Sequence, residues 1–159
     1  GRSDLYFKDL ATYACVVGEE RKLGIFGGTG LDLDVRSKRL FDIPSGSKTE
    51  YVIKYISGNR IPLLKLSEMY LIAAEASGDK GYLQTLRDHR GYVNYPLEEN
   101  CDLAAEIEAE YRKEFIAEGQ LFYYYKRLDY VTLPEMGVVM TGNYVFPMPD
   151  DEIEFGDIK

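Results

Sequence analysis

The strongest constraint on the fold is a stretch that combines charged and aromatic residues at helical spacing. Residues 107–128 read IEAEYRKEFIAEGQLFYYYKRL. Apolar side chains recur in it every three or four positions, and Glu110, Glu114 and Glu118 lie one helical turn apart. The pattern predicts a long amphipathic helix that begins near Asp102 and breaks or bends at Gly119.

Two more helices are predicted upstream of this stretch. The first carries an apolar stripe of period 3.6 that consists of Leu66, Met69, Tyr70, Ala73 and Ala76. It ends at Gly78, and a shorter helix over residues 82–90, which points Leu83 and Leu86 inward, ends at Gly91. The order of elements predicts two helix–turn–helix pairs. This arrangement is typical of tetratricopeptide-like folds, in which neighbouring pairs bury faces that a lone pair cannot.

The amino-terminal third has a different pattern. Apolar spacing predicts a first helix over about residues 6–17, whereas residues 19–58 hold glycines, turn clusters and short β-type runs. We therefore expect a mainly α chain with an irregular loop region near the amino terminus, and short strands at 32–35 and 51–55. The predicted division is residues 1–60 for the amino-terminal helix and loop region, and 61–159 for the helical part.

The glycines between Gly24 and Gly30 invite comparison with a nucleotide-binding turn. A dinucleotide fingerprint needs a third glycine three positions after the second, where this chain has Leu33. The residues that follow alternate like a strand and do not open a helix. The segment is predicted to be a flexible loop, and no cofactor is expected.

Charge and length exclude several classes of protein. The 159 residues include 27 acidic and 19 basic side chains, so the net charge of −8 argues against nucleic acid as a partner. No apolar run approaches the length needed to span a bilayer. The sequence begins Gly-Arg-Ser-Asp without an initiator Met, and we expect it to be a fragment of a longer parent chain.

Metal and catalytic chemistry find little support in the sequence. His89 is the single histidine, and the two cysteines, Cys15 and Cys101, match no metal or redox spacing and are expected to be buried free thiols. Calcium stays open at Asp32 with Asp34 or in the acidic run 150–152, although neither has the spacing of a calcium loop. No metal site is therefore predicted.

The carboxylates of the long helix allow two interpretations. Glu114 and Glu118 could serve acid–base hydrolysis of a glycosidic bond. Alternatively, they face solvent or pair with an arginine from a neighbouring helix, such as Arg87, Arg90 or Arg127. We expect the second, and hence no enzyme, while a glycosidase remains an alternative.

The aromatic residues favour sugar binding. The chain has fourteen tyrosines and seven phenylalanines but no tryptophan. Sugar C–H faces stack on aromatic rings, and tyrosine hydroxyls can bond sugar hydroxyls. The candidate ligand-binding residues are those in predicted loops, namely Tyr92, Tyr95, Tyr130 and Tyr144. The alternative for each is a place at the edge of the helical core.

Several strings, in order, resemble the carboxy-terminal part of the RagB/SusD family. They are SEMYLIAAEA at 67–76 preceded by Lys65, LQTLRDHRG at 83–91, EYRKEFIAEG at 110–119 followed by Lys126 and Arg127, YVFPMPDDEI at 144–153, and the shorter landmarks Asp34-x-Arg36 and Lys54-Tyr55. Lys65, Tyr111, Leu121 and Tyr124 depart from residues usual in the family. The match covers roughly residues 34–153.

The resemblance implies a SusD-like glycan-binding protein that captures oligosaccharides or polysaccharides and does not cleave them. It further implies an outer-membrane lipoprotein on the cell surface, anchored through a part absent from this chain, that partners a SusC-like TonB-dependent transporter. A SusD-like protein that binds peptides stays open. The alternative from another class is a helical-repeat adaptor that binds peptide or protein partners without catalysis.

Overall fold

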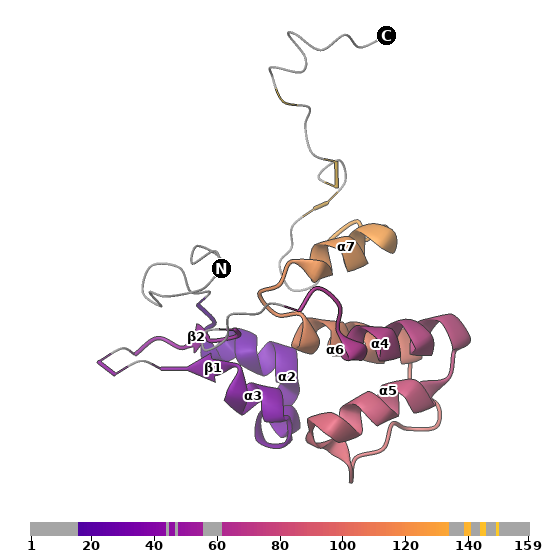
Figure 1. Cartoon of the computed structure of the whole chain (residues 1–159), viewed down its shortest axis with the longest axis horizontal. Coiled ribbons are helices and arrows are strands. Elements are labelled where there is room, and N and C mark those ends of the chain that lie inside the picture. Colours follow the sequence, from indigo (N-terminus) through magenta and orange to yellow (C-terminus); the bar gives the residue numbers. More distant parts are fainter. Residues whose placement is uncertain are drawn as a thin grey trace. The chain divides into compact units, whose positions relative to one another are not determined.

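The computed structural model describes residues 16–43, 45–46, 48–55, 62–133, 139–140, 144–145 and 149. The chain divides into two compact units, Gly1–Glu118 and Gly119–Lys159. Most of the described residues are helical, and a single two-stranded sheet accompanies the helices among them (Figure 1). The prediction of a mainly α fold is confirmed. The predicted boundary at residue 60 falls inside the first unit.

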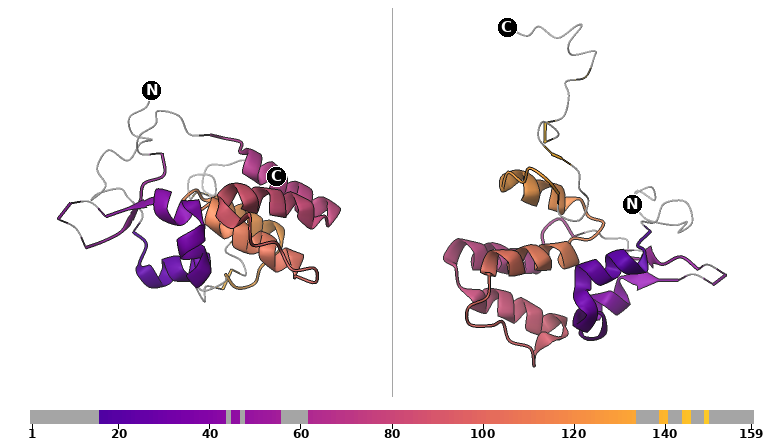
Figure 2. Two further views of the ribbon diagram at one scale, coloured as in Figure 1. Left: turned by 90° about the horizontal axis from the view of Figure 1, so that it is seen from below. Right: turned by 180° about the vertical axis from the view of Figure 1, so that it is seen from behind.

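Three helices form the helical half of the first unit. They are α4 (Leu66–Ser77), α5 (Lys80–Arg87), which continues into the π-helical turn η2 (Asp88–Tyr92), and α6 (Leu103–Glu114). Helix α4 packs against both α5 and α6 (Figures 1 and 2). The first predicted helix–turn–helix pair, α4 with α5, is therefore confirmed. The second would join α6 to α7, which belong to different units, so it stays a prediction, as does the tetratricopeptide-like repeat.

The predicted end at Gly78 and the predicted start at Asp102 are confirmed, whereas α6 ends at Glu114, five residues before the break predicted at Gly119. Gly78 ends α4 in the left-handed conformation, with a φ of 69°. Asp79 and Asp102 begin α5 and α6 because their side chains accept hydrogen bonds from Gly81 N (2.8 Å) and Ala105 N (3.2 Å). Gly91, with a φ of 113°, is the non-helical residue inside η2, one position before the turn ends at Tyr92.

The predicted apolar stripe of α4 is on the wrong face of the helix. The buried residues are Ser67, Leu71 and Ala74, whereas Leu66 is 73% exposed and Met69 43% exposed. Helix α4 is apolar on two opposite sides, so its periodicity does not identify the inner one. A polar residue, Ser67, marks the buried side because its hydroxyl donates to Glu114 Oε1 at 2.8 Å.

The amino-terminal region is more helical than predicted. Helices α2 (Glu19–Leu33) and α3 (Val35–Arg39) replace the irregular loop up to residue 39, and the strand predicted at 32–35 is wrong. The strand predicted at 51–55 is confirmed in its first two residues, β2 (Tyr51–Val52), which pairs antiparallel with β1 (Phe41–Asp42). The helix predicted over 6–17 lies mostly outside the described residues.

The glycine-rich segment forms a kinked helix, so the flexible-loop prediction is wrong. Gly27 supplies the kink in α2 with a φ of 70°. Burial of Phe26, whose ring meets Phe41 edge-on at 5.9 Å, outweighs the poor helix propensity of the glycines. Gly30 is needed for close approach, because a Cβ there would lie 2.8 Å from the Tyr92 hydroxyl.

The second unit contains helix α7 (Gln120–Arg127), which begins after Gly119 in the left-handed conformation. Tyr124 and Tyr125 of this helix are buried. An isolated bridge joins Thr132 to Val139. Among the residues described in either unit, no helix combines the length and the apolar character that crossing a bilayer demands.

Candidate functional site: a buried ion network and a polar hollow

Arg36 is the centre of a buried ion network in the first unit. Asp34 caps α3 by accepting from the backbone N of Arg36 at 2.9 Å, and its carboxylate also binds the Arg36 guanidinium at 2.9 and 2.7 Å. The same guanidinium pairs with Glu110 at 2.5 Å and Glu114 at 2.9 Å on α6. Burial disfavours the charged guanidinium, yet the hydrogen bond that it donates to Asp34 and the charges of the three carboxylates raise the pKa of Arg36 overall. The network therefore ties α3 to α6.

Glu114 receives hydrogen bonds from three elements. Ser67 of α4 donates at 2.8 Å, Arg36 of α3 at 2.9 Å, and Arg90 of η2 at 3.1 Å to each oxygen. Burial alone would raise the pKa of Glu114, but the hydrogen bonds and charges of Arg90 and Arg36 lower it to about 2. Glu114 is therefore ionised at neutral pH and unsuited to act there as a general acid.

Glu118 has its own set of cationic partners. Lys54 and Lys65 both form ion pairs with its Oε1, and the Tyr55 hydroxyl donates to it at 3.0 Å. Lys54 also donates to the backbone carbonyl of Glu114 at 2.5 Å, at the carboxyl end of α6. Burial lowers the pKa of Lys54 to about 8, although Glu118 opposes the shift. The interpretation of Glu114 as a partner of Arg90 is confirmed. For Glu118 the predicted arginine is wrong: its partners are Lys54 and Lys65, which lie outside the helices.

Sequence reasoning did not assign Arg36, Lys54 and Lys65 to these carboxylates. Arg36 and Lys65 are 78 and 53 positions from their carboxylate partners, and Lys54 is 60 positions from the Glu114 carbonyl that it also binds, so the distances in sequence exceed any helical or strand periodicity. The available signal was the pair of short landmarks, Asp34-x-Arg36 and Lys54-Tyr55. Both carboxylate oxygens of Asp34 accept hydrogen bonds from Arg36, which gives no support to calcium binding at Asp32 and Asp34, and the acidic run 150–152 lies outside the described residues.

Tyr92 is a core residue and does not lie in an exposed loop as predicted. It is 6% exposed, and the Arg87 and Lys113 cations lie over its ring at 4.9 and 5.3 Å from the centroid. Burial, followed by the nearby charges of Asp34 and Glu110, raises the pKa of its hydroxyl to about 12. Tyr92 thus packs the junction between the helices and offers little ring surface to a ligand.

Tyr95 lies at the rim of a polar surface hollow. The side chain is 46% exposed, and the hollow has a volume of about 680 Å³. Its polar lining includes Arg87, Asn94, Glu98, Asn100, Asp102 and Glu106. These side chains offer amide donors, carboxylate acceptors and one guanidinium beside an aromatic ring, which is the mixture that a hydroxyl-rich ligand requires.

The loop that carries Tyr95 is held in place by hydrogen bonds. Its backbone N donates to Tyr92 O at 2.9 Å, and Leu97 N donates to the Gln84 side chain at 2.7 Å. Lys80 donates to the carbonyls of Glu98 and Glu99 at 3.1 and 3.2 Å. A preformed hollow of this kind binds with a smaller entropic cost than a loop that must first be ordered.

The other two predicted ligand-binding tyrosines lie in the second unit. The Tyr144 hydroxyl donates to the carbonyl of Tyr130 at 2.9 Å, and the Tyr130 ring lies 5.0 Å from that of Tyr125. Both side chains are half-buried. The structure brings Tyr130 and Tyr144 together, and it places Tyr92 and Tyr95 in the other unit.

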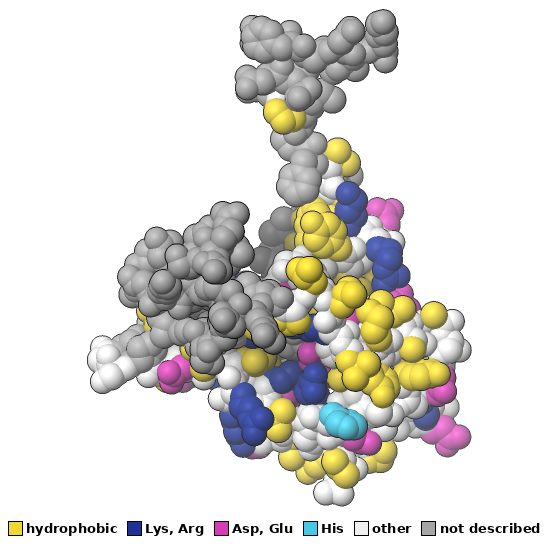
Figure 3. Space-filling model, viewed as in Figure 1, with side chains coloured by type: hydrophobic (Ala, Val, Ile, Leu, Met, Phe, Trp, Pro, Cys, Tyr) yellow, Lys and Arg dark blue, Asp and Glu magenta, His cyan; other side chains and the backbone are white. Residues whose placement is uncertain are grey.

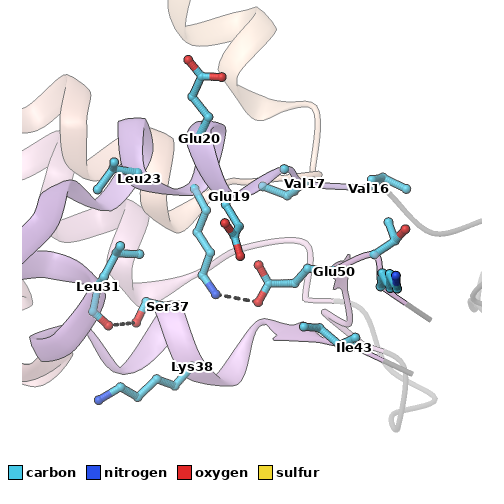
Figure 4. Close-up of a pocket in the computed structure, with 14 residues that line it drawn as sticks. Val16, Val17, Glu19, Glu20, Leu23, Leu31, Ser37, Lys38, Ile43 and Glu50 are labelled. Carbon is cyan, nitrogen blue, oxygen red and sulfur yellow. Dashed lines mark hydrogen bonds and ion pairs between the residues drawn. The ribbon is translucent and has the colours of Figure 1, made fainter. Parts of the chain in front are cut away.

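A second hollow, of about 910 Å³, lies between α2 and the strands (Figure 4). Val16, Leu23 and Ile43 give it apolar walls. Its central polar groups bond to each other: Lys22 pairs with Glu50 at 2.7 Å, and the Ser37 hydroxyl donates to Leu31 O at 2.7 Å (Figure 4). The hollow at Tyr95 also contains an internal pair, Arg87 with Glu106 at 2.6 Å, but its lining adds the amides of Asn94 and Asn100 and the exposed ring of Tyr95.

Cysteine and metal chemistry contribute nothing further among the described residues. Cys101 is a free thiol, half-buried at the edge of the Tyr95 hollow, and Cys15 lies outside the described part of the chain. No group of three or more potential ligands that could hold a metal ion occurs in the part that the structure describes.

Comparison with known proteins gives no match: no family model, no curated protein and no solved structure resembles this chain at a significant level.

Proposed function

We propose that this chain is the carboxy-terminal part of a SusD-like glycan-binding protein without catalytic activity. One observation carries the proposal. The residues behind the RagB/SusD resemblance come from strings that are far apart in the sequence, yet many of them meet in one buried network. They are Asp34, Arg36, Lys54, Tyr55, Lys65, Ser67, Arg90, Glu110, Glu114 and Glu118. A shared structural role is a physical reason for these strings to occur together and in this order.

The proposal includes the setting that the resemblance implies. The parent protein is a lipoprotein on the cell-surface side of the outer membrane, and it passes oligosaccharides to a SusC-like TonB-dependent transporter. The ion network is its scaffold and takes no part in chemistry. This assignment agrees with the paired state of Glu114 and Glu118, each of which is surrounded by cations.

Within this chain, the glycan-binding site is the hollow at Tyr95. The ring of Tyr95 supplies a stacking face, while Asn94 and Asn100 supply amides for the hydroxyls at its edge. Tyr92 supports the site because its backbone carbonyl accepts a hydrogen bond from Tyr95 N and so holds the start of the loop.

The test is a glycan array on the whole chain, followed by calorimetric titration of the best ligand. Loss of the stacking ring in Tyr95→Ala should weaken binding roughly 10-fold or more, and Tyr95→Phe should retain most of it. Tyr123→Ala is the matched control, because Tyr123 is also exposed (66%) but lies on α7. Equal affinity of Tyr95→Ala and the control would contradict a site at this hollow, and an array without any binder would contradict glycan binding by this chain.

A further inference from the structure

Helix α4 is apolar on the side that faces away from the core. We define its outer face as Leu66, Met69, Ile72, Ala73 and Ala76, together with Leu63 and Leu64 just before the helix. The exposed fractions are 73% for Leu66, 43% for Met69 and 46% for Ile72, and they reach 88% and 79% for Leu63 and Leu64. Figure 3 shows hydrophobic side chains gathered over this helix. A helix that is apolar on opposite sides is normally buried on both.

The size of the outer face suits a protein interface. Its five large side chains expose roughly 600 Å² in total, at the upper end of the largest apolar patch on a typical monomer and close to the ~800 Å² that each partner buries in a standard interface. Two such faces in contact would bury about 1,200 Å², the lower limit for a specific complex.

The charge of the chain favours this face as the contact between two copies. Each copy has a net charge of −8, so most pairs of surfaces oppose acidic groups. The residues of the outer face are uncharged, and Lys65, Glu68 and Glu75 lie beside them, so a contact centred on Met69 and Ala73 brings apolar side chains together and leaves the charged groups at its margin. Ala73 and Ala76 lie on it one turn apart, and small side chains at a crossing allow two helix axes to approach closely.

We propose that the outer face of α4 pairs with the same face of a second copy, to form a closed two-fold dimer. The contact is isologous, since one patch serves both partners, and it therefore ends at two copies. The core of the first unit does not depend on it, because the buried side of α4 is formed by Ser67, Leu71 and Ala74. The proposal stands apart from glycan binding, and its test uses no glycan.

The experiment is sedimentation velocity of the whole chain between about 5 and 200 µM, a range that brackets the micromolar affinity expected of a small interface. The mass should approach twice that of one chain as the concentration rises. Met69→Glu with Ile72→Glu should weaken the dimer by at least 10-fold, because two carboxylates would then be buried on each side. Val93→Glu with Val131→Glu is the control, since these valines are 68% and 63% exposed elsewhere and add the same charge.

A mixing experiment separates a true contact from a folding defect. Combining the Met69→Glu/Ile72→Glu variant with Met69→Lys/Ile72→Lys should restore a dimer, as opposite charges then meet across the interface. A single-chain mass at the highest concentration would overturn the proposal. So would association that continues past two copies, an equal loss in the Val93/Val131 control, or a mixture that stays monomeric.

Discussion

Replacing Glu114 with glutamine should remove one of the largest single electrostatic contributions to stability in this chain. The pKa of Glu114 is about 2 in the folded protein, against an ordinary value of 4.5 for a glutamate side chain. Each unit of difference corresponds to about 1.4 kcal/mol, so ionised Glu114 stabilises the folded state at neutral pH by about 3 kcal/mol. The substitution also leaves Arg36 and Arg90 without this carboxylate. The expected loss of stability therefore lies in the range of about 3–5 kcal/mol that is typical when one partner of a buried ion pair is removed.

The stabilisation by Glu114 should depend on pH in one direction. The folded-state pKa lies below the unfolded one, so the contribution is present above about pH 4.5 and is lost as the pH falls towards 2. The difference in unfolding free energy between the native chain and Glu114→Gln should therefore be largest at neutral pH. It should shrink steadily below about pH 4.5.

Urea denaturation at pH 7, 5, 4 and 3, followed by circular dichroism, measures this difference. The matched control is Glu106→Gln on the same helix, since Glu106 pairs with Arg87 at 2.6 Å but its side chain is 38% exposed. Such a pair contributes less than about 1 kcal/mol. Equal losses of stability in the two variants at pH 7, or a loss in Glu114→Gln that is the same at pH 3 as at pH 7, would contradict a buried ionised Glu114.

Three further substitutions test the fold through the stability of the chain. Gly91→Ala should destabilise the chain by more than about 2 kcal/mol, because its Cβ would lie 2.2 Å from Leu33 O at a φ of +113°. Gly28→Ala, with open space around it in α2, should instead stabilise the chain by roughly 0.5–1 kcal/mol. Thermal melts that show equal stability for the two variants would contradict the close approach of Gly91 to Leu33. Lys54→Met should flatten the pH dependence of the unfolding free energy between about pH 8 and 10.5. The folded pKa of Lys54 is about 8, so in that range the unfolded chain binds more protons than the folded one, and the stability of the native chain rises with pH. Parallel profiles for the native chain and Lys54→Met would argue against a buried, desolvated ammonium at this position.

The helix limits were predictable because their causes are local. A glycine in the left-handed region at Gly78, Gly91 and Gly119, and an aspartate cap at Asp102, need only neighbouring residues to act. Helix α2 was not predictable in the same way. Its glycines disfavour a helix locally, and the burial of Phe26 against Phe41 that overrides them is visible only in the folded chain.

The tyrosines of the candidate site show the same difference between local and long-range causes. The exposure of Tyr95 follows from a loop bounded by Gly91 and Asp102, which the sequence indicates. Tyr92, three residues earlier, is drawn into the core by Arg87, Lys113 and the missing side chain at Gly30. No periodicity distinguishes these two tyrosines, since the difference depends on elements that are distant in the sequence.

Helix α6 explains why scaffold and binding can be separated by experiment. Its carboxyl end and the turn that follows contain Glu114 and Glu118. These carboxylates form ion pairs with basic side chains of α3, η2 and the segment before α4. The amino end, at Asp102 and Glu106, lines the Tyr95 hollow two to three turns away. Substitutions at the carboxyl end should therefore change stability and leave a folded chain's affinity intact, while Tyr95 should change affinity alone. A Glu114→Gln chain that stays folded but loses the ligand would place the network within the binding site and contradict its assignment as scaffold.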